Sequence, residues 1–169
     1  MSIRARKLAE RIDEGASLLA SFARGLTDAQ WHTIVLPDGR TVGVLVHHVA
    51  SMYPIEMALV EKAVAGQAIT DVTWDVVAGI NAEHSRKFAG ATIAEALELL
   101  AINSRIASDA VRLLSDDDLD RAVPFSLNSG APMTVQFIIE DHALKHPWHH
   151  LVRMQKALAQ EPATFASAA

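Results

Sequence analysis

Apolar residues recur with a helical period over most of this chain, beginning close to its start. Between residues 3 and 24 they occur every three to four positions among charged residues, which predicts an amphipathic helix. Its apolar positions are Ile3, Leu8, Ile12, Leu18, Leu19 and Phe22. Ser2 is a suitable N-cap and Gly25 a suitable stop. Residues 26–41 then have the composition of a loop, with a short turn near Asp28–Trp31 and a strong turn signal at Pro37-Asp38-Gly39.

A long, mostly apolar segment from Val42 to Ala65 predicts a second helix that is largely buried and ends before Gly66. Pro54 lies inside this segment. Proline has no backbone N–H and its ring clashes with the preceding helical turn, so we expect a bend or a break there.

Three more helices are predicted. The first covers residues 74–89, the second begins at a capping box formed by Thr92 and Glu95, and the third covers residues 133–159. Ser115–Asp118 caps a short turn, residues 121–132 are predicted to be a loop, and no segment has a convincing strand pattern. These elements predict an all-α fold, a four-helix bundle of the antiparallel type with an extra short helix or turn. We expect one domain over residues 1–160 and a flexible C-terminal tail at 161–169.

Composition narrows the possible functions. A chain of 169 residues is about one domain, and its net charge of −5 argues against a nucleic-acid partner, which needs a basic surface. There is no cysteine, so disulfides, thiolate ligands and a nucleophilic thiol are excluded. The N-terminus has no apolar signal core, and no apolar run approaches the roughly 18 residues of a membrane span. We therefore expect a cytoplasmic protein with no membrane partner.

Histidines concentrate in Glu140–Leu151, which contains four of the eight in the chain. They are His142, His146, His149 and His150. In a helix, His146 and His150 lie one turn apart on one face, a spacing that lets two imidazoles bind one metal ion. Neutral imidazole suits a divalent metal such as zinc, nickel or iron. A pair shifted by one turn, His142 with His146, is an alternative.

Pro147 lies between these two candidate ligands. It removes the backbone hydrogen bond to the carbonyl of Ala143, and we expect strain or a kink in this turn.

A third ligand is needed for a catalytic type of site, which has three protein ligands and one open position. The pair His47-His48, in the middle of the apolar second helix, is the obvious source. Adjacent helical residues point about 100° apart, so only one of them faces the core squarely. The periodicity of the neighbouring apolar residues does not decide between the two.

The pattern L-x-H-H-V-A at residues 45–50, followed by H-x-x-H-H-L-x-x-M at residues 146–154, resembles the DinB/YfiT-like superfamily over nearly the whole chain. The resemblance implies a four-helix bundle with a metal bound by three histidines, one from the second helix and two from the last. Carried over to this chain, the metal ligands are His48, His146 and His150.

The resemblance also implies two kinds of chemistry. Members include thiol-dependent S-transferases and isomerases that use low-molecular-weight thiols such as bacillithiol or mycothiol, and metal-dependent hydrolysis is the neighbouring option. We expect a small-molecule substrate and a homodimer. No catalytic residue is identified from the sequence, and Glu56, Glu83 and Asp141 are the only candidates for a general base.

Three less specific interpretations stand beside this one. The histidines could form a buried cluster without metal, although burying imidazoles without partners costs free energy. The protein could be a metal- or ligand-binding stress protein without turnover. A di-iron carboxylate bundle needs Glu-x-x-His spacing, and neither Glu83 nor Glu140 has it.

Several residues near the motif have simpler expected roles. For Glu56, two turns past His48, we expect an interhelical or surface position, with a base or a partner of a metal ligand as the alternative. For His32 and His84 we expect ordinary core or surface positions, and His149 should point aside.

Overall fold

Helices make up nearly all of the regular structure in the computed structural model, which describes residues 2–159. The long segments are α1 (Ile3–Arg24), α3 (Val42–Val64), α5 (Ile93–Arg112) and a C-terminal segment of α7 (Val135–Ile139), η2 (Glu140–Leu144) and α8 (Lys145–Ala159). The shorter elements are α2 (Asp28–Trp31), α4 (Trp74–Lys87), α6 (Asp116–Asp120), β1 (Ala122–Pro124), η1 (Ser126–Asn128) and β2 (Pro132–Thr134). The predicted tail at 161–169 lies outside the described residues.

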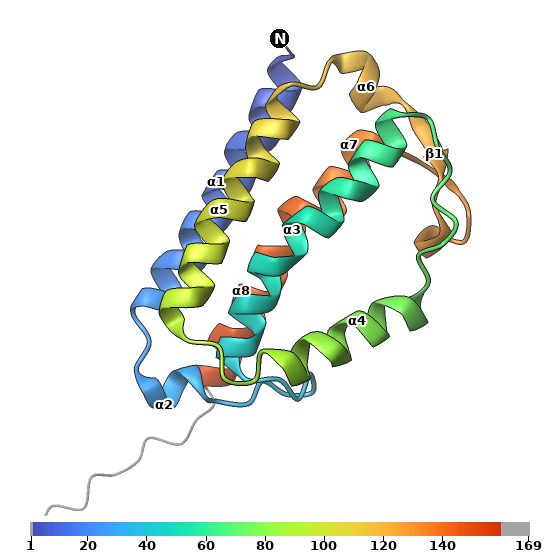
Figure 1. Ribbon diagram of the computed structural model, residues 1–169. Coiled ribbons are helices and arrows are strands. Elements are labelled where there is room, and N and C mark those ends of the chain that lie inside the picture. The colour runs from blue at the N-terminus through green and yellow to red at the C-terminus, as the bar shows by residue number, and fades with distance from the viewer. Residues whose placement is uncertain (1, 160–169) are drawn as a thin grey trace, which may run out of the picture.

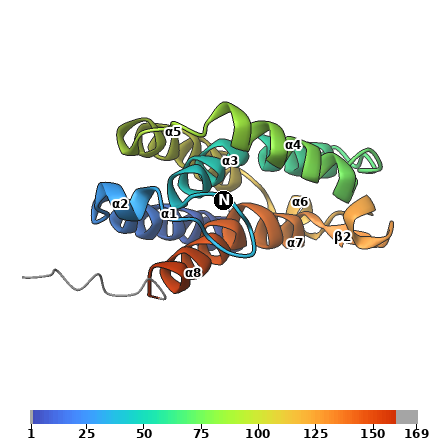
Figure 2. The same cartoon turned by 90° about the horizontal axis from the view of Figure 1, so that it is seen from below.

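The long segments form a four-helix bundle, which confirms the predicted fold class (Figure 1). α1 and the C-terminal segment run in one direction, while α3 and α5 run in the other (Figure 1). α3 and α5 are therefore parallel, so the expectation of a simple antiparallel order is wrong. The reason is that α4 and its flanking loops carry the chain back along the bundle before α5 begins. α4 lies at an angle to the long segments (Figure 1), and Figure 2 shows it beside α3.

The central helix is α3, which packs against α5, α4 and all parts of the C-terminal segment. By length and composition alone it would pass for a membrane span, so the expectation that no apolar segment is long enough is wrong. However, 72% of its most apolar stretch is buried inside the bundle. That burial is characteristic of a core helix.

Serine and threonine side chains begin most of the helices, as the sequence indicates. Ser2 accepts a hydrogen bond from the N–H of Ala5, and Thr41 accepts one from Val44. Thr92 and Glu95 form the predicted capping box. These caps satisfy backbone donors that have no partner within the first helical turn.

Pro54 does not break α3, which is continuous from Val42 to Val64. Because proline has no N–H, the carbonyl of Ala50 loses its helical hydrogen bond. The side-chain amide of Asn103 on α5 donates to this carbonyl instead, over 2.9 Å. The contact replaces the missing hydrogen bond and ties α3 to α5 close to His48.

The start of α3 is fixed by an aromatic ring that lies directly on its backbone. A Cβ at Gly43 would lie 2.4 Å from the indole of Trp31, so only glycine allows this approach. The indole N–H of Trp31 donates to the carbonyl of Ala91 over 2.9 Å. The ring therefore joins α2, α3 and the loop before α5.

The prediction that residues 121–132 are a loop and that the chain has no strand is wrong in part. β1 and β2 form a two-stranded antiparallel ladder in which Ala122 pairs with Thr134 and Val123 with Met133. Each strand has three residues, too few for an alternating pattern to be recognised. The last helix consequently begins at Val135, after Thr134 as N-cap, rather than at Met133.

The strain expected from Pro147 takes the form of a π-helical turn. η2 immediately precedes α8, in which Pro147 is the third residue. A π turn takes an extra residue into one turn of the helix and commonly accompanies such disruption. Residues before and after η2 therefore do not share a single regular α-helical face.

We expect the hydrogen bond from Asn103 to stabilise the fold because of Pro54. Asn103→Ala should lower the free energy of unfolding by about 1 kcal/mol, since it leaves the Ala50 carbonyl without a partner. In a Pro54→Ala background that carbonyl regains a helical donor, so the same substitution should cost clearly less. Urea unfolding of the two single variants and the double variant measures the coupling, and strictly additive effects would contradict it.

Candidate metal centre

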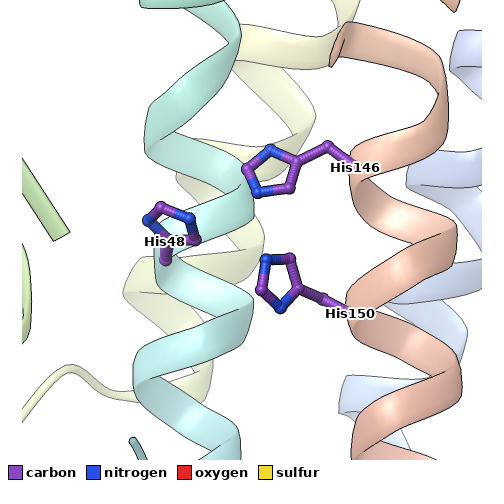
Figure 3. Close-up of side chains that lie close together, drawn as sticks. All are labelled: His48, His146 and His150. Atoms are coloured by element: carbon purple, nitrogen blue, oxygen red, sulfur yellow. The ribbon is translucent and has the colours of Figure 1, made fainter. Parts of the chain in front are cut away.

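The structure brings together the three histidines that the family pattern selects. His48 comes from α3, and His146 and His150 come from α8. One ligand nitrogen from each lies within 4.8 Å of those of the other two. Their ring centroids are 4.8 to 5.4 Å apart, and Figure 3 shows the rings grouped between the two helices. We call these residues the histidine triad.

Burial keeps two of the triad imidazoles neutral. His48 is 3% exposed and His150 is 5% exposed. This burial lowers the pKa of both residues, and the neighbouring His146 and the positive charge of Arg40 lower it further. A neutral imidazole has a lone pair on one nitrogen, which is the form that binds a metal.

The donor set fits a divalent metal ion. The Nδ1 atoms of the triad are shielded from solvent, and that of His146 lies against Glu56, so the nitrogen of His146 left for a metal is Nε2. One ring nitrogen of each residue faces the space between the rings (Figure 3). Three imidazole donors with an open fourth position are the ligand set of a catalytic zinc-type site. That these residues bind metal stays a prediction.

Glu56 lies behind one of the candidate ligands. Its Oε1 is 2.8 Å from Nδ1 of His146, although the two groups are not aligned for a hydrogen bond. The contact joins α3 to α8, so the interhelical role expected for Glu56 is found. The surface position is wrong, because Glu56 is 7% exposed. A carboxylate beside the second nitrogen of a metal-binding histidine fixes the orientation of the ring and raises its basicity.

A cavity of about 580 Å³ lies beside the triad. α3, α4 and the C-terminal segment supply most of its walls, including the three triad residues and Glu56. Its apolar lining residues include Met52, Ile55, Leu59, Val77, Ile80 and Leu127. The cavity is large enough for a small-molecule substrate beside the open side of the triad.

One end of the cavity holds charged residues that the sequence analysis missed. The guanidinium of Arg40 contacts Asp38 through Nε at 2.5 Å and Nη2 at 2.9 Å. Nη1 of Arg153 lies 3.2 Å from the same carboxylate. Burial by itself raises the pKa of Asp38, but the hydrogen bonds and charge of Arg40, together with Arg153, hold it below its usual value.

A signal for this charged end was present in the sequence. Arg153 follows His150 by three residues and therefore lies on the same face of α8. Asp38 and Arg40 belong to the predicted turn that leads directly into α3.

The structure separates the histidine pair on α3. His47 Nδ1 lies 2.9 Å from Nε2 of His84, and its ring stacks on Phe88 with a centroid distance of 4.1 Å. His47 thus contacts α4, while its neighbour His48 faces α8. His84 is buried, which fits the core position expected for it.

None of the remaining candidates belongs to the group of three ligand nitrogens that the described residues form. The ring of His142 packs against Phe125, which leaves the shifted pair of His142 with His146 without a third histidine. His149 and His32 are exposed. Of the other candidate bases, Glu83 is exposed, and Asp141 lines the cavity but contacts the ammonium of Lys145 at 2.8 Å.

Comparison with known proteins supports the same fold. The family model described as the DinB superfamily matches residues 11–153. A solved structure, described as "YfiT from Bacillus subtilis is a probable metal-dependent hydrolase with an unusual four-helix bundle topology", superposes with a TM-score of 0.75 and 19% sequence identity. The match covers 94% of this chain and 89% of that one. No curated protein matches the chain.

We expect the metal-free protein to lose stability in mild acid. Below pH about 6.5 the unfolded chain protonates its histidines, whereas His48 and His150 stay neutral in the fold. The unfolded state then binds more protons, so the free energy of unfolding falls as the pH falls, by up to about 1.4 kcal/mol per pH unit for each residue.

Urea unfolding between pH 7.5 and 5.0 tests this expectation, with His48→Gln as the comparison. His48→Gln removes one of the two groups. The slope of the free energy of unfolding against pH should therefore fall by the contribution of about one proton. An unchanged dependence would contradict the proposed neutral state of His48.

Glu56→Gln should weaken metal binding without unfolding the protein. The substitution keeps the shape of the side chain but removes the charge beside His146, and loss of such a partner typically costs 10- to 100-fold in metal affinity. Competition with a chelator of known affinity measures the change, with circular dichroism as the test of folding. Glu61→Gln, at an exposed position of α3, is the control. Equal affinities in both variants would show that Glu56 does not act on the site.

Proposed function

This chain belongs to the DinB superfamily, and we propose that it is a metal-dependent hydrolase whose divalent metal is bound by His48, His146 and His150. One observation carries the proposal. Within the described residues, the triad has no fourth histidine or carboxylate in its group, and it faces a cavity of substrate size. A site that only stabilised the fold would typically have a fourth protein ligand. The description of YfiT as a probable metal-dependent hydrolase supports the same reaction class.

The protein's own residues have separate roles in this proposal. The triad binds the metal, which when bound supplies a Lewis acid and lowers the pKa of a water molecule. Glu56 holds the ring of His146 in place through the Nδ1 contact. The apolar walls from α3 and α4 exclude bulk water around the substrate, which strengthens electrostatic interactions at the reacting bond.

Thiol transfer is the second candidate, and it differs only in the nucleophile. The chain has no cysteine, so a thiol would have to come from a cosubstrate such as bacillithiol or mycothiol. The same triad would hold the metal that activates the sulfur in place of water, with the substrate in the same cavity. A requirement for added thiol therefore separates the two reactions. Zinc, nickel and iron all fit the imidazole donors.

Other expectations stay predictions from the sequence. They are the cytoplasmic location, the homodimer, and the stress protein that binds metal or a ligand without turnover.

Metal content and ester hydrolysis together test the proposed function. Purified without a tag, the wild type should contain about one equivalent of zinc, nickel or iron, by mass spectrometry of the elements. His48→Ala and His150→Ala should lose it, while His32→Ala, at an exposed position, should keep it. A folded wild type without metal would contradict the proposal.

Hydrolysis of 4-nitrophenyl acetate without thiol should depend on the metal and fall at least about 100-fold in both triad variants, because the activated water is lost. Conjugation of 1-chloro-2,4-dinitrobenzene to mycothiol or bacillithiol, without ester hydrolysis, would favour the transferase instead. Bound metal with neither activity over a broad panel of esters, amides and thiols would favour the non-catalytic protein.

A further inference from the structure

We propose that the cavity binds an amphipathic organic acid, whose carboxylate lies against Arg153 and Arg40 and whose apolar part lies between α3 and α4. The proposal rests on the proposed function for the reaction, because it names the substrate class of the same site. Binding of the acid does not require the metal, because the proposed contacts are all made by protein side chains.

The charged end of the cavity has more positive than negative charge. Arg40 and Arg153 share one carboxylate, that of Asp38, so one positive charge is left uncompensated. The other cation of the lining, Lys145, is neutralised by Asp141 at 2.8 Å, and the third carboxylate of the lining, that of Glu56, lies against His146. A negatively charged group is therefore the natural occupant of this end.

Donors for that group remain on Arg153, while Arg40 contributes its positive charge. Asp38 contacts Nε and Nη2 of Arg40, and Nη1 of Arg40 is shielded from solvent with no hydrogen-bond partner. Arg153 contacts Asp38 through Nη1, and its side chain is 28% exposed. Its other nitrogens have no acceptor among the described residues. The accessible N–H groups of Arg153 can therefore donate to the oxygens of a bound acid, and such charge-assisted hydrogen bonds are stronger than neutral ones.

This end lies next to the triad. Arg153 follows His150 by three residues on α8, and the turn holding Asp38 and Arg40 leads into α3 ahead of His48. The charge of Arg40 also contributes to the lowered pKa of His48 and His150. An acid held by Arg153 therefore extends past the metal ligands into the rest of the cavity.

The remainder of the cavity is apolar and is closed by a helix with little packing of its own. Among the residues of α4, His84 alone is buried, so its apolar side chains are not part of the bundle core. Val77 and Ile80 instead line the cavity opposite Met52, Ile55 and Leu59 of α3. These side chains face open volume, which an apolar portion of a ligand would fill.

Two probes that differ only in charge test this proposal. They are 4-phenylbutyrate and its neutral amide, 4-phenylbutanamide, titrated calorimetrically at neutral pH. The titrations use the metal-loaded protein and also the chelator-treated protein, whose folding is checked by circular dichroism. The second form separates binding at the arginines from coordination of a carboxylate to the metal.

Matched variants identify the residues responsible. Arg153→Gln removes the accessible guanidinium. Arg112→Gln is the control. Arg112 also pairs with a carboxylate, that of the half-buried Asp13, and its side chain is 33% exposed, close to the value for Arg153. It lies in a separate groove between α1 and α5. Ile80→Asn tests the apolar wall on α4.

In the metal-free protein we expect the acid to bind at least about tenfold more tightly than the amide, which is the scale of one charge-assisted hydrogen bond. Arg153→Gln should abolish this preference and Arg112→Gln should keep it. Ile80→Asn should weaken both probes by a similar factor. Binding of the acid only when metal is present, or an unchanged preference in Arg153→Gln, would overturn the proposal. If the protein binds no metal but keeps the Arg153-dependent preference, the proposed hydrolase fails and this inference stands.

Discussion

The approach of α3 to α8 across the core is the contact on which the candidate site depends. His48 has its two partner histidines on the other helix, so a small rotation or shift of either helix would separate them. Three structural features hold the two helices in place. Trp31 packs on Gly43 at the start of α3, Asn103 ties α3 to α5 at Ala50, and the π turn η2 sets the rotation of α8. Because one helical residue corresponds to about 100° of rotation, the extra residue of η2 decides which histidines face α3.

The site also concentrates polar groups in an otherwise apolar bundle. Its imidazoles, the carboxylate of Glu56 and the Asp38–Arg40 pair are all largely removed from water. Burying such groups costs free energy unless they bind one another, a metal or a ligand. The pairing of Asp38 with Arg40 and of Glu56 with His146 offsets part of that cost within the protein. The triad imidazoles and Arg153 line the cavity, where a metal and an acidic ligand are proposed to bind.

Much of the fold could be predicted from local patterns. The helices followed from apolar periodicity and from caps such as Ser2 and Thr92, which depend on neighbouring residues only. The β1–β2 ladder, the continuity of α3 through Pro54 and the parallel course of α3 and α5 depend on contacts between distant segments. Asn103, for instance, lies about fifty positions from the carbonyl that it satisfies. No local pattern contains that information.

The candidate site divides in the same way. Periodicity left His47 and His48 undecided, and the family pattern selected the one that the structure places beside His146 and His150. For Glu56 an interhelical position was predicted, with a place beside a metal ligand as the alternative. The place of Arg153 and of the Asp38–Arg40 turn at the site was not predicted, because it depends on the contact between α8 and that turn. The face of α8 shared by His146, His150 and Arg153 was visible in the spacing, but nothing in the sequence showed that the turn at Asp38 meets it.

The most direct test of the account is a crystal structure of the metal-loaded protein, with diffraction data collected on both sides of the absorption edge of the bound metal. The account predicts one strong anomalous peak between the rings of His48, His146 and His150, at about 2.0–2.1 Å from one nitrogen of each if the metal is zinc. A peak elsewhere, or three histidine rings with no peak between them in protein that contains stoichiometric metal, would contradict it.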